Sequence, residues 1–272
     1  MASPSPGALA AVLFDLDDTL VPWHTLPHWQ WAWRPRGPVL SERHVLAAVH
    51  RSLHAWDRRR WQGLVGEAPP ADLAAHRAHL EATLAAIAGH PLPADETTAV
   101  VNRFLKPAGE IESFPDVVPC LAQLAADGVG VGVVTALPAE AAHHALKRVG
   151  LGDLHVVATG ESSSPPLPAP AAWRAAAEAV GHKPREILYV GDLFWSDVRA
   201  ATRVGFSTVL VDRRDWLPRV LARRIRTLAD VPGLRKNPTP EPGPPPGHEE
   251  GPSSQPPARP NPSAPPPGGT QP

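Results

Sequence analysis

The stretch that most constrains this chain runs from Ala11 to Leu20 and reads AVLFDLDDTL. A short apolar run that ends in polar residues is typical of a buried strand in a parallel sheet. Because side chains at i and i+2 share one face of an extended chain, Asp15 and Asp17 are predicted to lie together at the end of this strand. Two neighbouring carboxylates repel each other, so a divalent cation held by oxygen atoms is the natural counter-ion.

Composition excludes several classes of protein. The 272 residues suffice for one large domain, or for a domain with an insertion. A formal net charge of −1 provides no field that would attract nucleic acid or a membrane surface, so neither is an expected partner. The single cysteine, Cys120, excludes an internal disulfide. The apolar run before Asp15 is too short for a signal peptide, and no run approaches a membrane span of about 18 residues, so we expect a cytoplasmic protein.

The C-terminal segment differs in composition from the rest of the chain. Of 36 prolines, 15 lie in residues 238–272, where large apolar residues are almost absent. Such a segment cannot bury enough surface to offset the entropy of ordering, so residues 233–272 are predicted to be a disordered tail with polyproline II character. Two interpretations remain open, a dispensable tail and a ligand for a proline-recognition domain.

Residues 21–112 are predicted to be helical. Four prolines within 21–38 argue against one regular element there. Apolar residues recur at intervals of three and four in a helix that begins at Ser41, in a second over 71–88 and in a third over 95–105. No strand is expected in this block.

The rest of the chain alternates between strands and helices. Strands are predicted at 9–14, 129–134, 155–159, 187–191 and 208–211, separated by helices. This alternation indicates an α/β fold with a five-stranded, Rossmann-like parallel sheet. We therefore divide the chain into a core of residues 1–20 and 113–232, an all-helical cap inserted at 21–112, and the tail.

Polar residues follow several of these strands. Thr135 ends the second strand, and the segment from Gly191 to Asp197 has the form GDxxxxD. A lone Gly-Asp pair after a strand is a weak signal. The order DxDxT, a strand ending in Thr and then GDxxxxD, around a helical insertion, resembles the haloacid dehalogenase-like (HAD) superfamily of hydrolases, in its phosphatase branch.

That resemblance implies a role for each matched residue. Asp15 would be the nucleophile that forms an aspartyl-phosphate, and Asp17 the general acid and base, which dehalogenases of the superfamily lack. The Thr135 hydroxyl and the Ala136 backbone N–H would bind the phosphate. The cofactor would be Mg²⁺, held by Asp15, Asp17, Asp192 and Asp197, with Asp17 using its backbone carbonyl.

One position departs from the family pattern. The third motif of the superfamily is a lysine before a helix, and in this chain Leu167 stands there, among prolines that fit the motif. The loss of such a preorganised charge typically lowers a rate by about 10² to 10³. Two functions therefore stay open: a Mg²⁺-dependent phosphomonoesterase acting on a small phosphorylated metabolite, and a weakly active or inactive scaffold that binds a partner or a phosphorylated ligand.

The cap is rich in tryptophan and histidine. Trp23, His24 and His28 follow soon after the DxDxT segment, which would form the catalytic loop. We predict that they line the entrance for the substrate, whereas the other tryptophans are expected to form the core of the cap.

Overall fold

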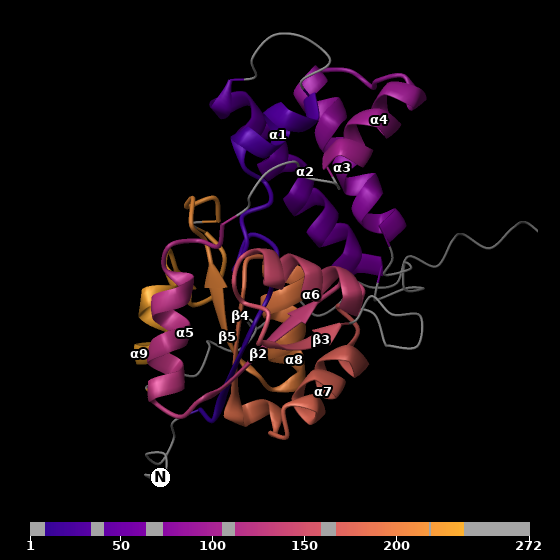
Figure 1. Ribbon diagram of the computed structural model, residues 1–272. Helices are drawn as coiled ribbons and strands as arrows, with labels where there is room; N and C mark the ends of the chain where they lie inside the picture. Colours follow the sequence, from indigo (N-terminus) through magenta and orange to yellow (C-terminus); the bar gives the residue numbers. More distant parts are fainter. Residues whose placement is uncertain are drawn as a thin grey trace, which may run out of the picture. The chain divides into compact units, whose positions relative to one another are not determined.

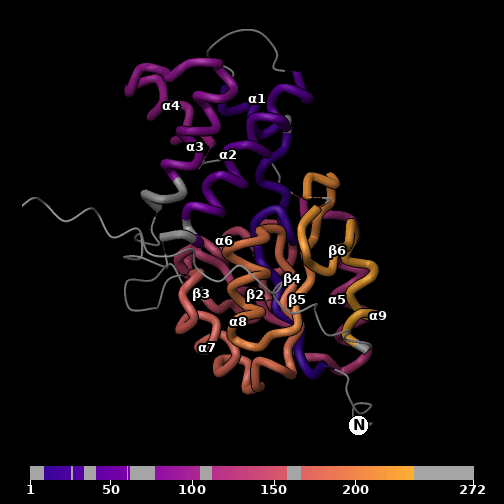
Figure 2. Tube along the Cα trace, turned by 180° about the vertical axis from the view of Figure 1, so that it is seen from behind, coloured from indigo at the N-terminus to yellow at the C-terminus, as the bar shows by residue number. Residues whose placement is uncertain are grey.

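The computed structural model describes residues 9–33, 41–63, 73–104, 112–158, 167–217 and 219–236. Its centre is a parallel sheet of six strands in the order β3-β2-β1-β4-β5-β6, with β3 and β6 at opposite edges (Figures 1 and 2). The strands are β1 (Ala11–Phe14), β2 (Gly130–Thr135), β3 (His155–Ala158), β4 (Ile187–Gly191), β5 (Ser207–Val211) and β6 (Arg224–Ile225). The predicted α/β class is confirmed, and the predicted number of five strands omitted β6.

Helices cover both faces of the sheet (Figure 1). Val12 and Phe14 of β1 belong to one buried cluster, with residues of α5, α6 and α9, while Ala11 and Leu13 belong to a second, with residues of α7 and α8. Alternate residues of an extended strand point to opposite faces, so β1 is buried from both sides. These helices are α5 (Val117–Ala126), α6 (Ala139–Arg148), α7 (Pro170–Ala179), α8 (Ala200–Val204) and α9 (Val231–Lys236). Shorter helical turns are η2 (Pro184–Glu186), the π-helix η3 (Phe194–Arg199) and η4 (Leu228–Asp230).

Four helices lie between β1 and α5 in the sequence. They are α1 (Leu26–Trp33), α2 (Glu42–Gly63), α3 (Leu73–Ala88) and α4 (Ala94–Phe104). They bury an apolar cluster of their own that includes Trp29, Val49 and Phe104. Within 21–38 the structure describes one helix, α1, which covers part of that range, and Pro27 lies in its first turn, where a missing backbone N–H is tolerated. Ser41 caps α2 as expected, since its hydroxyl accepts a hydrogen bond from the backbone N–H of His44.

The point where the chain leaves the sheet for these helices lies beside the point where it returns. The backbone N–H of Phe114 donates a hydrogen bond of 3.1 Å to the carbonyl of Leu20. Arg213, just after β5, donates to the carbonyl of Thr19 and forms a 2.8 Å ion pair with Asp116. Its guanidinium also lies 3.9 Å from the centre of the Phe114 ring. The two connections are therefore fixed to each other and to the sheet.

The core extends beyond its predicted end at residue 232. Helix α9 continues to Lys236, and Arg235 exchanges hydrogen bonds with the backbone of Leu9. Residues 237–272, which make up most of the predicted tail, lie outside the described residues. Among the helices that the structure describes, none combines the length and the apolar character needed to cross a bilayer.

Candidate active site

Two central strands bring the first pair of predicted site residues together. Phe14 of β1 pairs with Val190 of β4, and the backbone N–H of Asp15 donates to the carbonyl of Val190 at 2.9 Å. Asp15 and Asp192 therefore follow neighbouring strands at the same edge of the sheet. The carboxyl ends of parallel strands are where folds of this class place their ligands.

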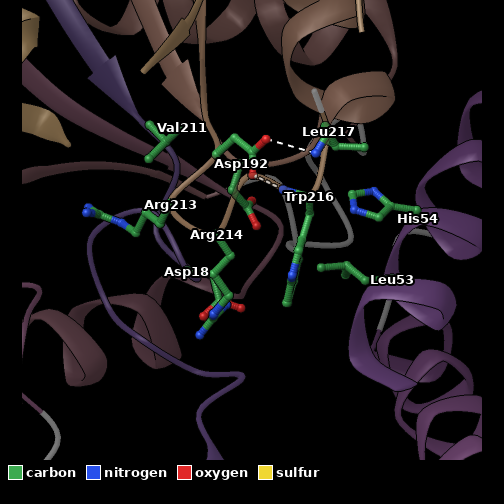
Figure 3. Close-up of a pocket in the computed structure, with 10 residues that line it drawn as sticks. Asp18, Leu53, His54, Asp192, Val211, Arg213, Arg214, Trp216 and Leu217 are labelled. Carbon is green, nitrogen blue, oxygen red and sulfur yellow. Dashed lines mark hydrogen bonds between the residues drawn. The ribbon is translucent and has the colours of Figure 1, made fainter. Parts of the chain in front are cut away.

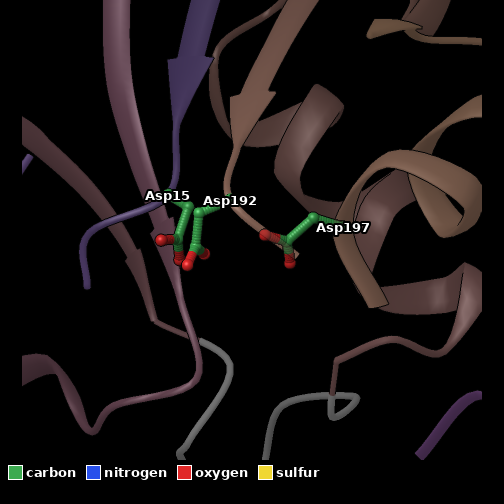
Figure 4. Close-up of side chains that lie close together, drawn as sticks. All are labelled: Asp15, Asp192 and Asp197. Carbon is green, nitrogen blue, oxygen red and sulfur yellow. The ribbon is translucent and has the colours of Figure 1, made fainter. Parts of the chain in front are cut away.

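Asp197 completes an acidic cluster. One carboxylate oxygen from each of Asp15, Asp192 and Asp197 lies within 4.8 Å of the other two. Figure 4 shows the three side chains grouped beyond the ends of the strands. Asp197 belongs to the π-helix η3, and its Oδ2 accepts a hydrogen bond of 3.2 Å from the backbone N–H of Leu193. Gly191 permits this approach, because a Cβ atom there would lie 2.5 Å from the same oxygen.

The carboxylates of the cluster carry like charges, which repel one another. Burial raises the pKa of Asp15 well above its usual range, and the neighbouring Asp197, Asp192 and Asp17 raise it further. The pKa of Asp192 is also raised well above its usual value, first by burial and then by Asp197. The Oδ2 atom of Asp15 is buried without a hydrogen-bond partner among the described residues. Three convergent carboxylates with an unsatisfied buried oxygen fit a hard divalent cation such as Mg²⁺.

Asp17 lies beside this cluster rather than in it. Burial raises the pKa of its carboxyl to about 7, with a further contribution from Asp18. Asp18 adopts a left-handed backbone conformation, with φ of 58°, which aspartate tolerates better than most residues. Its Oδ1 accepts hydrogen bonds from the backbone N–H groups of Trp23 and His24, at 2.9 and 3.1 Å. Asp18 thus fixes the loop after β1, a role that the sequence analysis did not assign.

The predicted phosphate-binding residues follow β2. Thr135 is the last residue of that strand and is buried, and its hydroxyl accepts a hydrogen bond of 3.2 Å from the backbone N–H of Leu137. Ala136 is exposed. Because β2 is the other neighbour of β1, both residues end up at the edge of the sheet that carries Asp15.

Leu167 packs among apolar side chains. It is 6% exposed and belongs to the same buried cluster as Leu13, Trp173 and Tyr189. The hydroxyl of Tyr189 is buried without a hydrogen-bond partner among the described residues. Its pKa is raised well above the usual value by burial, followed by the charges of Asp197, Asp15 and Asp192. Leu167 therefore brings no charge to the buried cluster in which the Tyr189 hydroxyl lacks a described hydrogen-bond partner.

The three residues predicted at the entrance differ in exposure. His24 and His28 are buried, and Nε2 of His28 lies 2.7 Å from the carbonyl oxygen of Phe104. The His24 ring stacks on those of Trp29 and Phe104. Trp23 is half-buried and lies 5.5 Å from the His28 ring, measured between ring centroids. The structure thus gives the two histidines contacts inside the helical segment.

A pocket beside Asp192 contains residues that the sequence analysis missed. Figure 3 shows Arg214 and Trp216, from the loop after β5, and His54 of α2 around the same hollow as Asp18 and Asp192. Burial, and then the neighbouring His50, lower the pKa of His54 to about 4, so its imidazole is neutral near pH 7. No short motif marks these positions, because they come from segments far apart in the sequence.

Comparison with known proteins gives the family. The family model described as haloacid dehalogenase-like hydrolase matches residues 9–205, which include all the acidic residues of the cluster. The chain belongs to the haloacid dehalogenase-like hydrolases. The resemblance inferred from the DxDxT and GDxxxxD motifs is thereby confirmed, and the chain is an enzyme of this family.

Curated relatives and solved structures agree with this assignment. A glyceraldehyde 3-phosphate phosphatase from Methanopyrus kandleri is 32% identical over 216 residues, 78% of this chain and 88% of that protein. A phosphoglycolate phosphatase from Rhodospirillum rubrum is 31% identical over 209 residues, 74% and 78% of the two chains. The L-2-haloacid dehalogenase of Xanthobacter autotrophicus superposes with a TM-score of 0.60 at 21% identity, over 84% of this chain and 99% of that one. At that identity the superposition shows a shared fold.

Gly191→Ala tests the close approach at the acidic cluster. The added Cβ would lie 2.5 Å from Oδ2 of Asp197 and 2.9 Å from Cε1 of Tyr189, so either both side chains or the backbone at this position must shift. We expect activity to fall by roughly 10²-fold, as is common when a site shifts by about 1 Å. Gly130→Ala is the matched control, because its Cβ would make an ordinary 3.6 Å contact with Ala11. Equal activity of both variants, measured as kcat/KM, would show that Gly191 is not needed for the geometry.

Proposed function

We propose that this HAD-like hydrolase is a Mg²⁺-dependent phosphomonoesterase that acts through an aspartyl-phosphate on Asp15. The observation that carries the proposal is the convergence of the Asp15, Asp192 and Asp197 carboxylates at the end of the central strands. These residues, with the backbone carbonyl of Asp17, would hold the metal. Bound Mg²⁺ supplies positive charge that stabilises the transferring phosphoryl group.

The chemistry of the side chains is a double displacement. A carboxylate oxygen of Asp15 attacks phosphorus while the bond from phosphorus to the ester oxygen breaks, and the Asp17 carboxyl gives its proton to that oxygen. Water then attacks the phosphorus, Asp17 takes a proton from it, and the bond between phosphorus and Asp15 breaks. A pKa of about 7 suits Asp17 to both transfers near neutral pH. The Thr135 hydroxyl and the Ala136 N–H would bind the phosphoryl oxygens.

A small phosphorylated metabolite is the substrate class that we propose. The names of the two curated relatives state small phosphate esters as their substrates. In this chain the pocket beside Asp192 offers a cation on Arg214, a neutral imidazole on His54 and the ring of Trp216 to the leaving group. Helices α1 to α4 would serve as a cap that reads this group and excludes water. The cytoplasm, where such metabolites occur, is the proposed location.

A metal-dependence assay tests this function. We expect the purified protein to hydrolyse short phosphate esters with Mg²⁺ present, and hydrolysis to stop when a chelator removes the metal and to return when Mg²⁺ is added back. Hydrolysis at an unchanged rate in excess chelator would contradict the metal dependence. A screen of phosphorylated two- to four-carbon compounds, with p-nitrophenyl phosphate as a generic ester, would identify the preferred leaving group.

The burial of Leu167 supports a second candidate function. With an apolar side chain at the position of the motif lysine, the site retains an excess of negative charge that opposes a phosphate dianion. The chain would then be a weakly active or inactive scaffold that binds a phosphorylated ligand or a protein partner. Ligand binding without turnover at saturating Mg²⁺ would favour this alternative.

A further inference from the structure

Asp57 of helix α2 binds the segment of the core that carries Asp197. Its carboxylate accepts three hydrogen bonds, from the backbone N–H groups of Trp195 and Ser196 at 2.9 and 2.8 Å and from the Ser196 hydroxyl at 2.6 Å. Asp57 is fully buried, with 0% of its surface exposed. A buried carboxylate is tolerated only when hydrogen bonds or charges satisfy it, so these contacts are strong constraints on both segments.

The three hydrogen bonds fall on the first turn of η3. Trp195 and Ser196 are the second and third residues of that π-helix, where backbone N–H groups have no partner within the helix. The residue before the helix, Leu193, makes no side-chain cap. A carboxylate at this end also interacts favourably with the helix dipole. Asp57 therefore supplies, from a segment about 140 residues away, the cap that η3 lacks locally.

Aromatic contacts flank this connection. One helical turn beyond Asp57, the ring of Trp61 lies 6.0 Å from the ring of Trp195, measured between centroids. The guanidinium of Arg203, on helix α8, lies 5.2 Å from the centre of the Trp61 ring. Helix α2 thus contacts both η3 and α8, and its position does not depend on the hydrogen bonds of Asp57 alone.

We propose that Asp57 is a positioning residue for the acidic cluster, which holds the first turn of η3 so that Asp197 faces Asp15 and Asp192. Asp197 directly follows Ser196, and its own carboxylate closes onto the N–H of Leu193 at the start of the same turn. Helix α2 then supports the metal site from outside it, and any closing motion of a cap must leave the contact between α2 and η3 intact. This inference rests on the function proposed above, because it assumes that the cluster binds Mg²⁺.

Asp57→Asn tests the proposal with little change of shape. The amide keeps one acceptor oxygen, but its NH₂ group would face a backbone N–H, so at least one hydrogen bond is lost. We expect the Mg²⁺ dissociation constant, measured by titration calorimetry without substrate, to rise about 10- to 100-fold, as is typical when a group supporting a metal ligand is removed. Ser196→Ala, which removes only the hydroxyl, should give a smaller rise. With substrate, kcat of Asp57→Asn should recover at saturating Mg²⁺ while KM for the substrate stays unchanged.

Glu42→Gln provides the matched control. It removes a negative charge from the exposed first turn of the same helix, and we expect no change in Mg²⁺ affinity. Circular dichroism identifies variants that fail to fold, in which case Ser196→Ala decides alone. Folded Asp57→Asn and Ser196→Ala variants with wild-type Mg²⁺ affinity would overturn the positioning role and leave the proposed function standing. A wild-type protein that binds no Mg²⁺ would instead overturn the proposed function, and this inference with it.

Discussion

Asp15→Asn is expected to reduce hydrolysis of phosphate esters by on the order of 10⁴-fold or more. The amide that replaces the carboxylate is a poor nucleophile, and the change also removes one of the three negative charges of the acidic cluster. The measurement is kcat/KM on p-nitrophenyl phosphate at saturating Mg²⁺, with a phosphate-release assay on metabolite esters as a second readout. Turnover at the wild-type rate would exclude the aspartyl-phosphate mechanism.

The same variant should gain stability as it loses activity. Burial and neighbouring charges raise the pKa of Asp15, so without metal its ionisation costs the folded state free energy as the pH rises above the ordinary carboxyl pKa. Removing the carboxyl removes that cost, and the melting temperature at pH 8 without Mg²⁺ should rise. Asp153→Asn, at an exposed position, is the control and should change neither quantity.

Leu167→Lys is expected to raise phosphatase activity, by roughly 10²-fold if the site has no other cation in this place. Leu167 shares a buried cluster with Leu13 and Tyr189, and Asp15 follows Leu13 by two residues on the same face of the chain. The Oδ2 atom of Asp15 and the hydroxyl of Tyr189 are both buried without a hydrogen-bond partner among the described residues. A lysine at this position would find acceptors for its ammonium group on that face.

Two further variants make this experiment decisive. Leu167→Met replaces leucine by an unbranched side chain of similar volume without charge, and its activity should stay at the wild-type level. Arg214→Gln tests whether Arg214, in the pocket beside Asp192, already supplies the positive charge that the motif lysine would bring. A large loss for Arg214→Gln, together with no gain for Leu167→Lys in a protein that still melts cooperatively, would place the compensating cation on the loop after β5.

The sequence predicts the strands of this fold well, for identifiable reasons. Buried parallel strands are continuous apolar runs, and each of the five predicted ones ends in turn or site residues, so their positions match the structure within about two residues. The acidic cluster follows from the same pattern, because the carboxyl ends of β1 and β4 bring Asp15 and Asp192 to one edge. Strand β6 was missed, since two residues, Arg224 and Ile225, carry no periodicity.

Contacts between distant segments could not be predicted. Asp57 lies in a helix whose other polar residues are mostly exposed, and nothing in its surroundings distinguishes it from them. Its partner Ser196 lies inside the GDxxxxD segment, at a position the motif leaves open. The place of Arg214 and His54 in the pocket could not be predicted for the same reason, because the loop after β5 and helix α2 approach each other only in the folded chain. One sequence contains local patterns, whereas these positions depend on tertiary packing.

The hydrogen bond between Phe114 and Leu20 allows the segment between these two residues to vary in length. Because the core itself holds these two points together, the segment between them is a loop whose closure is already provided. The entropy of closing a flexible loop grows only with the logarithm of its length, by about 0.6 kcal/mol for each doubling. We therefore expect that segments of quite different length and shape could be exchanged here without unfolding the sheet, and under the proposed function each would present a different surface to the leaving group. Such an exchange keeps the acidic cluster in order only if the new segment also brings a carboxylate to the first turn of η3.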